Sequence, residues 1–256
     1  MISALYTDLP GNTEEQLLQA LQKGLANGTG TANIFFRADD IGVPGKHFFH
    51  LIELFKTHKL PLCLAVVPTW LTSGRFNTLK SHAEASSSQW CWHQHGWLHR
   101  NHETEGKKQE FGAARVANLQ IDDLSNGQSR LNELMGDSFS PFFTPPWNRC
   151  SADTLHGLQN LGFKAVSRSK NAKPKSPETL PDFQVNIDLH TRKETEPTSC
   201  FNNLLLEIEG GISSGTAGVM IHHQRMNEAA FQFLNLLLKT VSASPTLHPV
   251  LFQELL

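Results

Sequence analysis

Short apolar runs and amphipathic stretches alternate along most of the chain. Seven apolar runs predict strands, at 33–37, 62–67, 90–94, 141–143, 163–167, 185–188 and 217–222. Helical periodicity predicts helices at 12–26, 46–58, 111–135, 151–161, 201–209 and 227–240. Strands that alternate with helices indicate a parallel sheet, because each parallel connection needs a crossover segment.

The number of these units favours a barrel over an open sheet. About seven strand and helix units follow one another without an obvious linker, and the Pro-rich polar segment 170–181 is interpreted as an excursion within the domain. No internal repeat is apparent. We therefore expect one domain over residues 1–256, of the α/β class, built as a single distorted (β/α) barrel with about seven parallel strands.

Composition narrows the class of protein. The chain has 256 residues, of which 39% are hydrophobic and 18% charged, as in a soluble globular protein. The 22 basic and 24 acidic residues give a net charge of -2 without a basic stripe, which argues against a nucleic-acid partner. No apolar run approaches the roughly 18 residues of a membrane span.

The cysteines and the first residues bear on the cellular compartment. Cys63, Cys91, Cys150 and Cys200 are widely spaced, and the N-terminal segment lacks the cationic and apolar regions of a secretion signal. We therefore expect reduced core cysteines in a cytoplasmic protein.

Polar residues gather where predicted strands end. They form clusters at 37–40, 93–102, 144–149 and 222–224. In a parallel barrel these strand ends share one face, and the loops that follow them build the active site. Residues far apart in the sequence are thus expected to become neighbours.

The histidines at 93–102 are the strongest chemical signal. Four of the 13 histidines fall in these ten residues, where even spreading would place about 0.5. His95 and His99 are four residues apart, a spacing that would put both imidazoles on one side of a helical turn, and imidazoles are good ligands for transition metals. The alternative is a polar loop whose histidines pack against Trp92 and Trp97.

Asp39 and Asp40 close an apolar strand. Adjacent carboxylates at such a place are costly unless a cation or another partner neutralises them. One can ligate a metal while the other faces the substrate. The alternative is a helix cap or a turn before Gly42. Two histidines and one carboxylate leave positions open for water, which is how catalytic zinc is held.

Four motifs taken together resemble the polysaccharide deacetylase superfamily. They are Arg-Ala-Asp-Asp-Ile-Gly at 37–42, His-Gly-Trp-Leu-His at 95–99, Thr-Pro-Pro-Trp-Asn at 144–148 and Val-Met-Ile-His-His at 219–223. The resemblance spans residues 34–223. It implies a polysaccharide deacetylase-like barrel of seven β/α units that hydrolyses N-acetyl or O-acetyl groups on sugars with an Asp-His-His metal site.

The resemblance also implies roles for individual residues. Asp39 resembles the catalytic base, and Asp40, His95 and His99 resemble the metal ligands. His222 resembles the catalytic acid, although without the resemblance a solvated pair with His223 would be favoured.

Further residues are expected around the substrate. Trp147 can cover a sugar ring or an acyl methyl group, or simply pack in the core. The expected substrate-binding set is Arg37, Pro146, Trp147, Asn148 and Arg149.

The chain also departs from the superfamily pattern. Arg37 stands where the superfamily has threonine, and Thr144 stands where it has arginine. Arg37 or Arg149 would then orient the base. The segment 188–190 lies near the place of a further motif but lacks its tryptophan.

The expected function is metal-dependent hydrolysis. The metal would polarise the acyl carbonyl, Asp39 would activate water and His222 would protonate the leaving group. We expect one divalent transition metal, zinc by default, with cobalt, nickel or iron accepting the same ligands. The expected substrate is a small molecule or a glycan precursor. The alternatives are a cyclic-amide or other carbon–nitrogen hydrolase, and a non-catalytic, metal-containing carbohydrate-binding protein.

Overall fold

The computed structural model describes residues 2–83 and 87–256 and divides the chain into two compact units. The first unit comprises Met1–Ala38, Gly45–Leu62 and Val185–Leu251. The second comprises Asp39–Pro44, Cys63–Gln184 and Phe252–Leu256. The prediction of a single domain over the whole chain stays a prediction.

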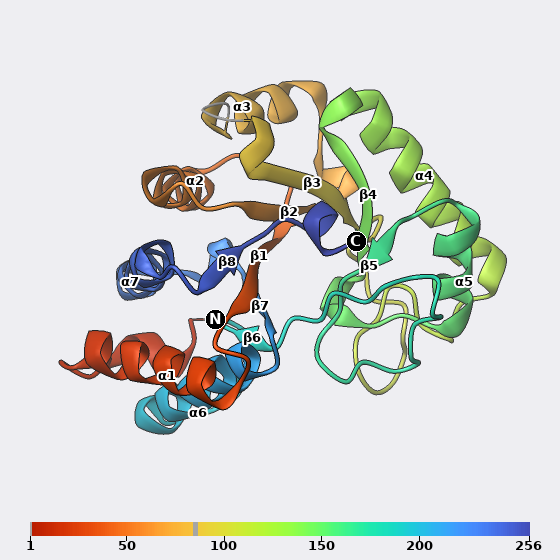
Figure 1. Ribbon diagram of the computed structural model, residues 1–256. Coiled ribbons are helices and arrows are strands. Elements are labelled where there is room, and N and C mark those ends of the chain that lie inside the picture. The colour runs from red at the N-terminus through yellow and green to blue at the C-terminus, as the bar shows by residue number, and fades with distance from the viewer. Residues whose placement is uncertain (1, 84–86) are drawn as a thin grey trace. The chain divides into compact units, whose positions relative to one another are not determined.

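The first unit contains a parallel sheet around the first strand of the chain. Strand β1 (Ala32–Ile41) lies between β7 (Thr216–Ile221) and β8 (Leu247–Pro249), and β6 (Ile187–Asp188) pairs with the other edge of β7 (Figure 1). All of these pairs are parallel, with Phe35 opposite Gly218 and Ile187 opposite Val219. The last residues of β1 belong to the second unit.

Four helices complete the first unit. They are α1 (Thr13–Asn27), α2 (Lys46–His58), α6 (Pro197–Ser213) and α7 (Glu228–Ala243). Helix α1 packs against α6, and α2 packs against α7 (Figure 1). Each buries one apolar stripe, as expected of amphipathic helices that cover a sheet.

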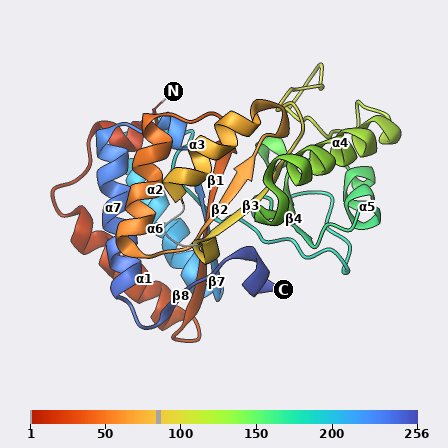
Figure 2. The same cartoon turned by 90° about the horizontal axis from the view of Figure 1, so that it is seen from above.

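The second unit contains the strands that carry the histidines. Its strand order is β2 (Leu62–Val66), β3 (Trp90–His95), β4 (Phe139–Thr144) and β5 (Ala165–Val166), and β4 is parallel to both β3 and β5. Helix α3 (Ser73–Ala83) precedes β3, while α4 (Ala117–Met135) and α5 (Ala152–Asn160) lie side by side (Figure 2). Since His95 is in register with Thr144, both residues lie at the same carboxyl edge.

The structure confirms the predicted α/β class with parallel strands, and it corrects some boundaries. The helix predicted at 111–135 begins at Ala117, because Phe111 forms a bridge with Cys150 and its carbonyl accepts a bond from Ser151. Helix α3 and strand β8 were not predicted. The segment 170–181 contains no helix or strand, as expected.

Two compositional expectations can be compared with the structure. The cysteines Cys63, Cys91, Cys150 and Cys200 are free and buried, as predicted. No described helix is both long and apolar enough to cross a membrane.

Candidate metal centre

Asp40, His95 and His99 converge in the second unit. The Oδ1 atom of Asp40 lies 3.2 Å from Nε2 of His95 and 3.1 Å from Nε2 of His99. One ligand atom from each residue falls within 4.8 Å of the other two. Zinc bonds of about 2.0–2.1 Å in tetrahedral geometry separate neighbouring ligand atoms by about 3.3 Å. The three side chains therefore fit a divalent transition metal.

The loop between the two histidines is not helical, so the expectation of a shared helical turn was wrong. His95 is the last residue of β3, and the chain turns immediately at Gly96, whose φ is +61°. A Cβ atom at Gly96 would overlap Oε2 of Glu110 and lie 2.6 Å from Cγ of Pro146. The two imidazoles meet because the strand ends in a tight, glycine-dependent turn.

Glu110 holds this loop from inside the unit. Its buried carboxylate accepts hydrogen bonds from the backbone N–H of Leu98 at 2.6 Å and of Trp97 at 3.2 Å. Burial raises the pKa of Glu110 above its usual 4.5, although these two bonds act in the opposite direction. Glu110 thus satisfies two amides of the loop that carries His99.

Thr144 and His93 support His95. The Nδ1 atom of His95 lies 2.9 Å from the carbonyl oxygen of Thr144, so Nδ1–H donates there and Nε2 is left for a metal. The Thr144 hydroxyl lies 2.9 Å from Nε2 of His93. Thr144 therefore contacts both histidines of β3, and His93 lies outside the convergent group.

The charge environment of His95 favours a cation. Burial alone lowers the pKa of His95, but the bond to Asp40, the negative charges of Asp39 and Asp40 and the bond to Thr144 outweigh it. The pKa is therefore raised from its usual 6.5. The same carboxylates that favour a proton on His95 would favour a metal ion.

Two tryptophans flank His99. The ring of Trp147 lies 4.6 Å from the His99 ring, and that of Trp70 lies 5.6 Å from it. Trp147 comes from the turn after β4, whereas Trp70 ends the short 3-10 helix Pro68–Trp70 after β2. Sequence reasoning named Trp147 and missed Trp70. Its position just after a strand was the available signal.

Backbone strain is concentrated at this place. Four of the six non-glycine residues with positive φ in the described chain are Asp40 (62°), His99 (56°), Trp147 (56°) and Asn148 (60°). Residues other than glycine rarely adopt this backbone conformation. Those that do often lie in functional sites. Two of the three converging side chains come from such positions.

The other predicted site residues are placed as follows. Asp39 is buried in the second unit, next to Asp40 in β1. Pro146 is buried, and the guanidinium of Arg149 donates to the carbonyl of Lys108 at 3.3 Å.

Arg37 and His222 belong to the first unit. The guanidinium of Arg37 is buried and lies 3.3 Å from Sδ of Met220. His222 follows the last residue of β7. Their predicted roles, and those of Asp39 and residues 146–149, stay predictions.

Solved structures with the same fold cover most of this chain. One is a Mycobacterium smegmatis protein assigned to the polysaccharide deacetylases, with a TM-score of 0.66, 14% identity and 88% of each chain covered. Another is a family 4 acetyl xylan esterase from Clostridium thermocellum in complex with a cobalt ion, with a TM-score of 0.58, 10% identity and coverage of 87% of this chain and 89% of that chain.

A CE4 family pseudoenzyme from Bacillus anthracis also shares the fold. Its TM-score is 0.51 at 12% identity, over 85% of this chain and 63% of that one. No protein-family model matches the sequence, and no curated protein matches it. The likeness shows that the fold is that of polysaccharide deacetylases and family 4 carbohydrate esterases, as the four motifs predicted.

Proposed function

We propose that this protein is a metal-dependent hydrolase that removes an acyl group, in the first instance N-acetyl, from a sugar or glycan precursor. The observation that carries the proposal is the convergence of Asp40, His95 and His99, with one carboxylate oxygen within 3.2 Å of both imidazole nitrogens. The shared fold supports it, because solved deacetylases and esterases have the same architecture.

Asp40, His95 and His99 would hold one divalent transition metal. Zinc is the expected ion, and cobalt, nickel and iron accept the same donors. A bound ion of this kind supplies a Lewis acid that polarises an acyl carbonyl. Thr144 and Glu110 serve the site by fixing the tautomer of His95 and the loop that carries His99.

Asp39 and His222 would carry the proton transfers. Asp39 is buried and directly precedes Asp40, and its carboxylate would take a proton from the attacking water. His222 would donate a proton to the departing nitrogen, because amines leave poorly unless they are protonated. Arg37 or Arg149 would orient the base.

The turn after β4 would contact the substrate. Trp147 presents its ring beside His99 and would cover a sugar ring or an acyl methyl group, and Trp70 approaches His99 as well. Pro146, Asn148 and Arg149 complete the proposed contact set.

The test is acyl release by protein of measured metal content. Wild type should bind one metal ion per chain and release acetate from at least one compound in a panel of N-acetylated sugars, sugar nucleotides and cyclic amides. Asp39→Asn and His222→Ala should keep the metal and lose roughly 10²- to 10⁴-fold in turnover, because each removes a proton-transfer step. The double variant His95→Ala/His99→Ala should lose the metal.

Other outcomes would identify a different function. Ring opening of a cyclic amide with no reaction on sugars would make the protein a non-sugar carbon–nitrogen hydrolase. Binding of sugars that stay intact, with equal affinity in Asp39→Asn, would make it a carbohydrate-binding protein. Full metal content in the double histidine variant would refute the ligand assignment.

A further inference from the structure

His190 is a buried histidine with no part in the function proposed above. It follows β6 in the first unit and belongs to the turn at 188–194. Its Nδ1 atom accepts a hydrogen bond of 3.1 Å from the backbone N–H of His222. Its Nε2 atom is buried without a hydrogen-bond partner among the described residues, and its ring lies 5.5 Å from that of Tyr6.

This contact fixes the protonation state of His190. An imidazole nitrogen accepts a hydrogen bond only with a free lone pair, so His190 is neutral and carries its proton on Nε2. Burial, and then the electrostatic influence of His222, His223 and Arg225, hold the pKa of His190 well below its usual 6.5. The acceptor therefore stays available at neutral pH.

The bond forms where the strand ladder ends. Asp188 is paired with Met220, and the N–H of Leu189 donates to the carbonyl of Met220 at 3.2 Å. Strand β7 ends one residue later, at Ile221. The imidazole of His190 takes the place of a strand carbonyl for the next backbone donor on the same side of β7, the partly buried N–H of His222.

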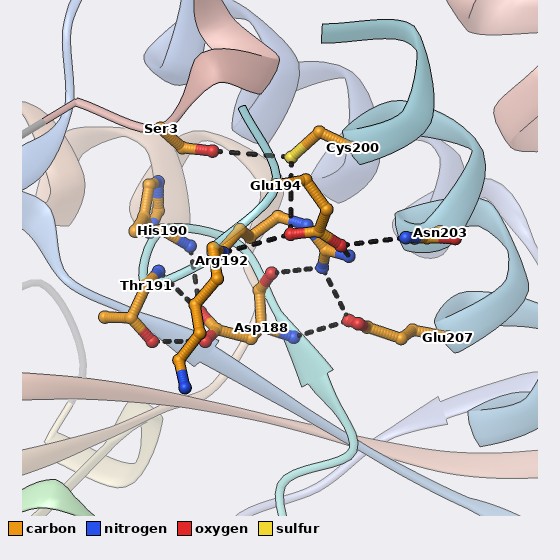
Figure 3. Close-up of polar contacts among 10 residues, drawn as sticks. Ser3, Asp188, His190, Thr191, Arg192, Glu194, Cys200, Asn203 and Glu207 are labelled. Carbon is orange, nitrogen blue, oxygen red and sulfur yellow. Dashed lines mark hydrogen bonds and ion pairs between the residues drawn. The ribbon is translucent and has the colours of Figure 1, made fainter. Parts of the chain in front are cut away.

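Hydrogen bonds to the side chain of Asp188 stabilise the turn around His190 (Figure 3). Oδ1 of Asp188 accepts bonds from the backbone N–H of His190 at 3.0 Å and of Thr191 at 2.9 Å, and Oδ2 accepts from the Thr191 hydroxyl. These bonds close a local turn that fixes the backbone of His190.

Arg192 ties the same turn to helix α6. Its guanidinium donates to the carbonyl of Asp188 at 2.9 Å and to Oε2 of Glu207 at 2.7 Å, and Glu207 also accepts from the Asp188 N–H at 3.1 Å. Glu194 accepts from the same guanidinium at 2.9 Å (Figure 3). The ring of His190 is thus held in a turn anchored on a helix.

We propose that His190 is a positioning residue for the catalytic acid: its imidazole holds the backbone N–H of His222 and so sets the direction in which the His222 side chain leaves the chain. This inference rests on the proposed role of His222. The direction of a Cα–Cβ bond follows from the backbone, and small displacements of a catalytic group are costly to turnover. His190 acts through His222 and touches no substrate.

A matched pair of variants tests the role of the acceptor. Asn places its Oδ1 the same number of bonds from Cα as Nδ1 of histidine, whereas Leu has nearly the same shape as Asn and accepts no bond. His190→Leu should lower kcat on an N-acetyl sugar about 10- to 100-fold with little change in KM. His190→Asn should remain within about threefold of wild type by keeping the acceptor.

The leaving group distinguishes positioning of an acid from general damage. An ester such as 4-nitrophenyl acetate releases a phenolate that needs no protonation, so its hydrolysis should be nearly equal in wild type, His190→Leu and His190→Asn. Metal content should be unchanged in all three. Equal losses on both substrates, or an Asn variant as impaired as the Leu variant, would overturn the proposal.

A separate measurement keeps this inference distinct from the proposed function. Hydrogen exchange at the His222 amide should be faster in His190→Leu than in wild type and near wild type in His190→Asn, whether or not the protein hydrolyses any substrate. Inactive wild-type protein with this exchange pattern would refute the proposed function and leave the contact standing. Unchanged exchange in the Leu variant would refute the contact.

The wild-type protein offers a further check if a variant fails to fold. The ¹⁵N shifts of a histidine ring report its tautomer, and His190 should carry its proton on Nε2 at neutral pH. A proton on Nδ1 would overturn the proposal, because Nδ1 could then not accept the bond from His222.

Discussion

The carboxylate of Glu110 accepts two hydrogen bonds from the loop between His95 and His99, the proposed histidine ligands. A carboxylate accepts at both oxygens, whereas a glutamine side chain would turn one N–H group towards a backbone donor. Glu110→Gln should therefore loosen the loop that positions His99. We expect metal affinity to fall about 10- to 100-fold, as is usual when the supports of metal ligands are changed.

Competition with a chromophoric chelator measures the metal affinity of Glu110→Gln and of wild type. Glu105→Gln is the matched control, since Glu105 is an exposed glutamate of the same segment between β3 and α4, and this variant should bind metal as wild type does. Equal affinity in Glu110→Gln and wild type would contradict the supporting role.

Gly96 makes the turn after His95. Gly96→Ala adds a methyl group against Glu110 and Pro146 at a φ of +61°, so it combines steric overlap with backbone strain. We expect a loss of more than about 2 kcal/mol in the free energy of unfolding. Urea denaturation followed by tryptophan fluorescence measures it.

Gly106 provides the control for this substitution. Its φ is +76°, but beyond its two chain neighbours no atom of the described residues lies within 4 Å of an added Cβ. Gly106→Ala should cost about 1 kcal/mol from backbone strain alone. If the two variants lost equal stability, steric overlap of the added methyl group with Glu110 and Pro146 would contribute nothing to the loss in Gly96→Ala.

The turn at 188–194 depends on one arginine. The Arg192 side chain is 2% exposed, whereas those of Glu194 and Glu207 are 25% and 35% exposed, so solvent screens part of each ion pair. Arg192→Met removes these bonds and leaves the carboxylates of Glu194 and Glu207 without their cationic partner. We expect a loss of about 1–3 kcal/mol in the free energy of unfolding, below the value for a fully buried pair.

The pH dependence of stability gives a second signature of this turn. Burial raises the pKa of Glu194, but bonds from Asn203 and Arg192 outweigh it and lower the pKa from 4.5 to about 2. A lowered carboxyl pKa stabilises the fold fully above about pH 4.5, and that stabilisation is lost as the pH falls towards 2. As the pH falls from 5 to 2, the midpoint of thermal unfolding should fall less in Arg192→Met than in wild type. An identical fall in the unfolding midpoint of both proteins would contradict the ion pair between Arg192 and Glu194.

Helices with a clear apolar stripe could be predicted from the sequence, and α2 was predicted at its observed bounds. Helix α3 was missed because its sequence, SGRFNTLKSHA, is mostly polar and buries few side chains. The start of α4 was misplaced because a bridge between Phe111 and Cys150 overrides the local helical preference. Long-range pairing of this kind produces no periodic pattern of hydrophobic residues in the sequence.

Metal binding should stabilise the whole chain although its ligands lie far apart in sequence. Asp40 and His95 are separated by 55 positions, so the ligand set exists only in the folded state. A free metal concentration of 100 times Kd should add about 2.7 kcal/mol to the free energy of unfolding. Differential scanning calorimetry with and without chelator should show a higher midpoint for the metal-loaded protein.

The double variant His95→Ala/His99→Ala is the control for this stabilisation. Its unfolding midpoint should not respond to metal or to chelator. An equal rise in wild type and in the double variant would place the stabilising ion elsewhere on the molecule.

At the level of the whole molecule, sequence reasoning named the three residues that converge, Asp40, His95 and His99, but not the residues that hold them. Asp40, His95 and His99 stood out because carboxylates and imidazoles are rare in such density at strand ends. Glu110 and Trp70 did not, since a single glutamate or tryptophan is common in any chain. Their positions depend on loops whose paths follow from tertiary contacts, and only the structure brings them to His95 and His99.

The left-handed backbone at Asp40, His99 and Trp147 has a consequence for protein engineering. Glycine relieves this strain, so a library selected for soluble yield alone should enrich glycine at these three positions. The same substitutions would remove two of the proposed metal donors and the proposed aromatic contact with the substrate. We therefore expect soluble yield and the proposed catalysis to be opposing objectives, and a stabilised scaffold made from this chain would need its added stability from residues outside the candidate site.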